Sequence, residues 1–77
     1  MEGTLTLNAL PVGSAARVKR LLLDGTIRRR MLDLGLIEGT RVKCLQNSPS
    51  GDPIAYLIRG AVIALRNEDS GRIEVEL

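Results

Sequence analysis

Histidine, phenylalanine and tryptophan are absent from this 77-residue sequence, which holds a single tyrosine, Tyr56, and a single cysteine, Cys44. Without histidine, the chain lacks the commonest general base and the commonest metal ligand of proteins. A lone cysteine forms no internal disulfide, and a nucleophilic cysteine needs an activating neighbour, usually a histidine. We therefore expect Cys44 to be a core residue, and we expect no enzyme activity, no resident cofactor and no site for a soft metal.

The shortage of aromatic rings also narrows the possible partners. Single-stranded nucleic acid is held by stacking on aromatic side chains, and proline-rich peptides dock in aromatic-lined grooves. Tyr56 is the one ring that the chain offers. The sequence therefore predicts no nucleic-acid partner, although residues 1–30 are basic, with six Lys and Arg against two acids.

Long apolar runs are missing as well. No uninterrupted apolar stretch approaches the ~18 residues that cross a membrane. Glu2, Gly3 and Thr4 stand where a signal peptide would have its basic start. We therefore expect a cytoplasmic protein. Its length predicts one domain, 1–77, and its hydrophobic fraction of 44% predicts an aliphatic core.

Short apolar segments separated by glycine and proline turns make up most of the chain. Alternating or contiguous apolar residues predict five strands, over 15–23, 40–46, 53–59, 61–65 and 72–77. A slip in the alternation predicts a bulge near Arg20, and Leu5 and Leu7 predict a further short strand or extended arm. In the last strand Ile73, Val75 and Leu77 share the inward face. The pattern predicts a mainly β fold, a small five-stranded SH3-like barrel.

One segment has the period of a helix instead. Apolar residues recur at i, i+4 and i+7 over 26–34, at Ile27, Met31 and Leu34. We expect one short inserted helix there, with Thr26 as its N-cap, and a single helical turn near 66–70. Gly35 follows the helix, where a left-handed conformation suits glycine, and Leu36 then folds back on Met31.

Three consecutive arginines, Arg28, Arg29 and Arg30, break a local rule of helices. The helix prediction places them in the first turn, where the positive end of the helix dipole disfavours each cation by roughly 0.3–1 kcal/mol. Sequences often break such rules at functional sites, and guanidinium groups bind carboxylates and phosphates well. The sequence therefore predicts a partner-binding surface in which Arg29→Glu weakens binding but not folding. The alternative is a solvated face whose aliphatic stems cover the core.

A second candidate surface is the loop 47–53, because binding residues favour exposed loops. Its candidate contact residues are Ser48, Ser50 and Asp52. The acidic residues Glu74 and Glu76 share one strand face, which we interpret as solvated, so no metal site is predicted. Edge strands of a small barrel can pair between copies of a chain, which leaves a homo-oligomer open.

Three longer motifs carry a family resemblance. They are LxxLPVG at 7–13, RRRMLDLGLIEGTRVKC at 28–44 and RGAVIALRNEDSGRIEV at 59–75. Together they resemble the FeoA family, which implies an SH3-like barrel with a helix inserted between its first strands. The structural turns of that barrel would be Gly35, Gly39 and Gly60.

The resemblance also implies a function. A FeoA-like chain would be a cytosolic accessory or regulatory protein of bacterial ferrous iron uptake. It would act through protein–protein interaction with FeoB, the membrane ferrous-iron transporter with a cytosolic G-protein domain. Its place would be the cytoplasm, or the periphery of the inner membrane, reached only through that partner. A small nucleic-acid-binding barrel and a divalent-metal-sensing module stay open as alternatives.

Overall fold

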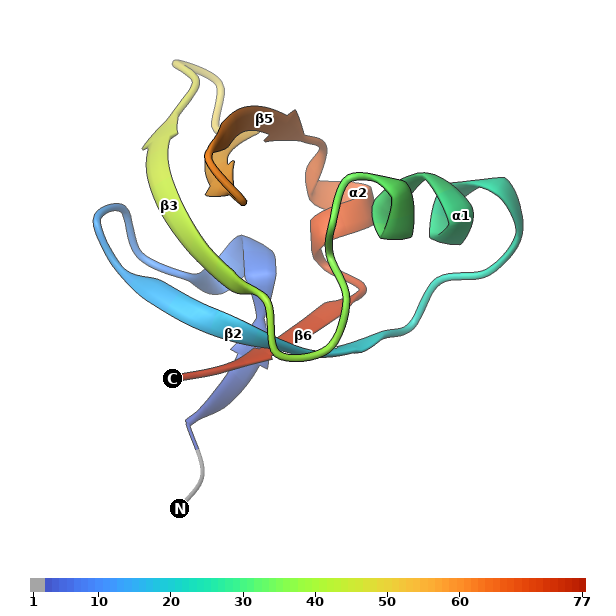
Figure 1. The fold of residues 1–77 in the computed structure, drawn as a ribbon. Helices are drawn as coiled ribbons and strands as arrows, with labels where there is room; N and C mark the ends of the chain where they lie inside the picture. The colour runs from blue at the N-terminus through green and yellow to red at the C-terminus, as the bar shows by residue number, and fades with distance from the viewer. Residues whose placement is uncertain (1–2) are drawn as a thin grey trace.

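The computed structural model describes residues 3–77, which form one antiparallel sheet with two helices and one 3-10 turn. In chain order the elements are β1 (Thr4–Thr6), the 3-10 turn η1 (Leu7–Ala9), β2 (Ala15–Leu21), α1 (Gly25–Asp33), β3 (Arg41–Asn47), β4 (Ile54–Ile58), β5 (Ala61–Leu65), α2 (Asn67–Ser70) and β6 (Ile73–Glu76). The strand order in the sheet is β1-β6-β2-β3-β4-β5. The strands curve around one side of the molecule, and α1 stands on the other side, next to α2 (Figure 1).

The mainly β prediction is confirmed, as are the inserted helix and the helical turn. The strand count is six, because the N-terminal segment forms a strand that pairs with β6, Thr4 opposite Glu76 and Thr6 opposite Glu74. The inward placement of Leu77 is wrong. Strand β6 ends at Glu76, and the side chain of Leu77, which follows the end of the strand, is 75% exposed.

The bulge predicted near Arg20 is present in β2. The register between β2 and β6 shifts between Val18 and Arg20, so that the strand bends where the apolar alternation slips. The strand ends at Leu21, two residues earlier than expected. Leu22 is half exposed and Leu23 is buried, because the chain leaves the sheet here to begin α1.

Helix α1 begins one residue earlier than predicted. Its N-cap position is Asp24, so Thr26 already lies inside the helix, and the prediction of Thr26 as the N-cap is wrong. Asp24 makes no capping hydrogen bond with its side chain. The earlier start moves the three arginines out of the first turn, and Arg30 lies in the last turn, where the helix dipole favours a cation.

The C-terminus of α1 ends in the glycine turn that the sequence predicts. Gly35 has a φ of +99°, the Leu36 N–H donates to the Met31 carbonyl at 3.1 Å, and the Gly35 N–H donates to the Leu32 carbonyl at 3.0 Å. These two bonds make a Schellman motif, which needs a left-handed residue at its turn. Met31 and Leu36 are both buried, so the helix is fastened to the core at this end.

The core is aliphatic apart from one ring and one thiol. Its largest fully buried side chains are those of Tyr56, Leu7, Met31, Leu36, Ile58, Ile73, Val18, Val42, Val75 and Cys44. The Tyr56 hydroxyl donates to the Leu7 carbonyl at 3.3 Å, so the polar end of the ring is satisfied inside the protein. The expected core position of Cys44 is confirmed.

Candidate partner-binding cleft

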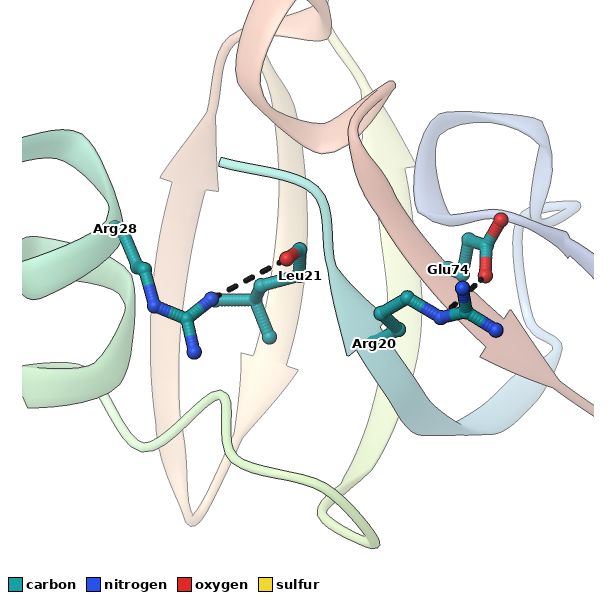
Figure 2. A network of polar contacts seen from close by, with 4 residues as sticks. All are labelled: Arg20, Leu21, Arg28 and Glu74. Carbon is teal, nitrogen blue, oxygen red and sulfur yellow. Dashed lines mark hydrogen bonds and ion pairs between the residues drawn. The ribbon is translucent and has the colours of Figure 1, made fainter. Parts of the chain in front are cut away.

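The three consecutive arginines have different surroundings in the structure. Arg28 Nη1 donates to the backbone carbonyl of Leu21 at 3.2 Å, and this contact ties the first half of α1 to the end of β2 (Figure 2). Arg29 is exposed on the helix surface. Arg30 is exposed too, but it lines a cleft between α1 and the segment that joins β5 to α2. The Arg28 side chain thus has a structural role, which the sequence did not indicate.

The cleft beside Arg30 has a volume of about 260 Å³. We call it the arginine cleft, and its lining residues are Arg30, Met31, Pro53, Ala64, Leu65, Arg66 and Asp69. Helix α1, strand β5 and helix α2 each contribute to it, so segments far apart in the sequence meet there. Met31 and Leu65 are buried and form an apolar part of the cleft wall, while Arg30 and Arg66 carry the positive charge of the cleft.

The charges of the cleft do not neutralise one another through ion pairs. Among residues 3–77, the pair within 4.0 Å joins Arg20 to Glu74 at 3.3 Å, on the neighbouring strands β2 and β6 (Figure 2). Arg30, Arg66 and Asp69 take no part in an ion pair there. The cleft therefore offers guanidinium donors to a carboxylate from outside the chain.

The loop 47–53 is hydrogen-bonded to the start of α2, the helix that lines one side of this cleft. The carboxylate of Asp52 accepts the backbone N–H of Asn67 at 3.0 Å, at the first residue of α2, and the Asn67 side-chain amide donates to the Gly51 carbonyl at 3.0 Å. Ser50 Oγ donates to the Asp52 carbonyl at 2.9 Å and lies 3.3 Å from Ser48 Oγ. Ser50 and Asp52 are thus engaged within the chain, and Pro53 is the member of this segment that reaches the cleft.

The structure therefore brings some predicted site residues together and separates others. Arg30 from one candidate surface and Pro53 from the other meet in the arginine cleft, whereas Arg28 is held against the sheet. Sequence reasoning missed Arg66 and Asp69. Both residues lie in a short polar segment whose sequence is typical of an ordinary helical turn, so no local pattern indicates a binding role. Their place in the cleft depends on the packing of α1 beside α2.

Groups with reactive chemistry are placed in the core. Burial raises the pKa of the Cys44 thiol above its ordinary value, and burial raises the pKa of Tyr56 to about 12. Both side chains are therefore neutral at pH 7. Within residues 3–77, no three His, Cys, Asp or Glu side chains are grouped so that they could hold a metal ion. In the same range, no helix has the length and apolar character needed to cross a membrane.

Comparison with known proteins identifies the family. The model of the FeoA domain matches residues 5–77. A Porphyromonas gingivalis protein, the Fe(2+) transport protein A/Fe(2+) transporter FeoB fusion protein, is 36% identical over 73 residues. The match covers 95% of this chain and 9% of that protein, so the chain spans a small part of its relative's length.

Solved structures agree in fold. The FeoA protein of Chlorobium tepidum is 33% identical, with a TM-score of 0.89 over 95% of this chain and 70% of that one. The FeoA of Stenotrophomonas maltophilia, solved with zinc and described as a prokaryotic SH3 domain protein, is 28% identical, with a TM-score of 0.83 over 92% of this chain and 88% of that one. The SH3-like barrel expected from the sequence is confirmed. The chain belongs to the FeoA family, a family of small accessory domains of ferrous iron transport and not of enzymes.

Proposed function

We propose that this chain is a cytosolic accessory protein of ferrous iron uptake that binds the cytosolic part of a FeoB-type transporter. One observation carries the proposal. In the Porphyromonas gingivalis relative, a segment 36% identical to this chain belongs to the same polypeptide as FeoB. A covalent link holds two modules at an effective concentration of about millimolar. Such a link is useful when the two modules must meet, and it suits a contact of modest affinity.

The surface of the chain is suited to recognition. Its buried thiol and phenol take no part in surface chemistry, and the exposed side of α1 carries Arg29 and Arg30. Exposed cations attract an oppositely charged surface over about 8–10 Å at moderate ionic strength, which raises the rate of encounter. An acidic surface on the transporter is the partner that this charge favours.

The test is a calorimetric titration of the chain with the purified cytosolic part of FeoB from the same organism. We expect saturable one-to-one binding that weakens as salt is raised past about 0.15 M, because exposed charges are screened. A parallel titration with single-stranded DNA serves as the control for a general affinity of the basic surface for polyanions. Failure to bind the transporter even at low salt, or tighter binding to DNA, would refute the proposal.

A further inference from the structure

We propose that the arginine cleft receives an aspartate or glutamate side chain of the partner protein, held between Arg30 and Arg66. This inference rests on the proposed function and adds to it the surface and the chemistry of recognition. Arg30 comes from the last turn of α1, and Arg66 directly follows β5. Both side chains are exposed at the cleft that they share.

Guanidinium groups fit a carboxylate better than any other cation of proteins does. The planar fork of arginine donates two parallel hydrogen bonds to the two carboxylate oxygens. Neither Arg30 nor Arg66 takes part in an ion pair within residues 3–77, so no partner has to be displaced first. The buried side chains of Met31 and Leu65 line the same cleft, and a charge pair next to apolar walls is screened less than one in open water.

The composition of the cleft favours a protein carboxylate over a phosphate. Asp69 lies in the same cleft, which lowers the formal charge of the lining from two positive charges to one. A phosphate group of a lipid or nucleic acid would meet that carboxylate without gaining from the apolar lining. A glutamate side chain carries a single charge at the end of aliphatic carbons, which can lie against Pro53 and Ala64, the apolar lining residues that keep accessible surface.

Asp69 also provides a test in which a substitution should strengthen binding, whereas substitutions of the two arginines should weaken it. An incoming carboxylate is attracted by the two arginines and repelled by Asp69. Replacing Asp69 by the isosteric asparagine removes the repulsion and keeps the shape of the cleft. We therefore expect the Asp69→Asn variant to bind the partner more tightly than the wild type. Binding through positive charges scattered over the surface would not depend on this one position.

The experiment measures the affinity of charge variants for the purified cytosolic part of FeoB from the same organism. Arg30→Glu and Arg66→Glu should each weaken binding about tenfold or more, because each turns an attraction at the cleft into a repulsion. Asp69→Asn should tighten binding about two- to fivefold, the range of one exposed charge interaction. Arg41→Glu is the matched control, since it makes the same charge change at an exposed arginine of β3 outside the cleft, and its loss should stay below about threefold.

Folding is checked by the dispersion of amide signals in an NMR spectrum of each variant. Arg30→Gln and Arg66→Gln replace the glutamate variants if reversal of charge disturbs the fold, and they should weaken binding in the same order. Arg30→Lys keeps the charge and removes the fork, so a loss intermediate between wild type and Arg30→Gln is expected.

The outcomes distinguish a failure of this inference from a failure of the proposed function. If the wild-type chain does not bind the transporter, both fall. If it binds and Arg41→Glu costs as much as Arg30→Glu, or Asp69→Asn weakens binding, the cleft is not the contact and only this inference falls. Binding to vesicles of phosphatidylcholine and phosphatidylglycerol that disappears with Arg30→Glu would assign the cleft to phosphate and also overturn it.

Discussion

Replacing Gly35 by alanine tests how the end of α1 is fastened to the barrel. Gly35 has a φ of +99°, a region that residues with a Cβ rarely adopt. A Cβ built there would also come closer to Arg59 Cδ than two carbon atoms can approach. The Arg59 side chain crosses from the β4–β5 turn onto the end of α1, so the substitution strains the backbone and displaces a neighbour at once.

The size of the effect follows from these two contributions. A non-glycine residue in a left-handed conformation costs about 1–2 kcal/mol. Driving Arg59 into a poorer side-chain conformation costs about 0.5–1.5 kcal/mol more. We therefore expect Gly35→Ala to lower the free energy of unfolding by about 2–3 kcal/mol, out of roughly 4–12 kcal/mol for a chain of this length. The corresponding fall in Tm is roughly 8–24 °C.

Urea unfolding followed by circular dichroism measures the loss, and Gly39→Ala is the matched control. Gly39 has a φ of +91°, but no heavy atom lies within 4 Å of a Cβ built on it, so it shows the cost of the backbone alone. Adding Arg59→Ala to Gly35→Ala should recover the difference between the two glycine variants. Equal losses for both glycines would refute the role of Arg59, and losses below about 0.5 kcal/mol would refute the backbone strain as well.

Three further predictions concern contacts described above. Burial raises the pKa of Tyr56 to about 12, above the ~10 of an unfolded tyrosine. The folded protein therefore holds the phenol proton more tightly than the unfolded chain does, and the stability that this provides is complete below pH ~10 and is lost as the pH rises to about 12. Phenolate absorbance of the lone tyrosine follows this titration, and Tyr56→Phe should abolish that part of the alkaline destabilisation. Asp52→Ala should cost about 1 kcal/mol of unfolding free energy, because the Asn67 N–H loses its acceptor, whereas Asp52→Asn keeps an acceptor and should cost less. Arg28→Ala should cost about 0.5–1 kcal/mol and speed hydrogen exchange in α1, since it removes the bond to the Leu21 carbonyl; unchanged exchange would show that this bond does not hold the helix.

Local patterns in the sequence predicted the features that depend on a few neighbouring residues. The slip in alternation near Arg20 marked the bulge, because one extra residue changes the phase of a strand. Gly35 after a helical run marked the end of α1, because the Schellman motif is formed by consecutive residues. The start of α1 was less determined, because Thr26 was predicted as the N-cap whereas Asp24, which is also a good capping residue type, occupies that position.

The cleft could not be predicted from the sequence for a physical reason. Arg30 and Arg66 are far apart in the chain, and they share a cleft only because α1 is placed beside the segment between β5 and α2. That placement depends on Met31 entering the core that distant strands enclose. The same limit applies to Arg28, whose hydrogen bond to Leu21 depends on how the helix lies against the sheet. The three arginines look alike in the sequence and differ only through tertiary packing.

The pairing of β1 with β6 determines where other polypeptide could be attached to this barrel. The Leu77 N–H donates to the Gly3 carbonyl at 2.9 Å, so the first and last described residues lie side by side, away from α1 in Figure 1. A linker joined at either end would leave from one common corner and would not pass over the opposite side of the molecule. This geometry lets a barrel of this kind be joined to a much larger protein through one corner, and the Porphyromonas gingivalis relative, of which this chain matches 9%, is a protein of that size.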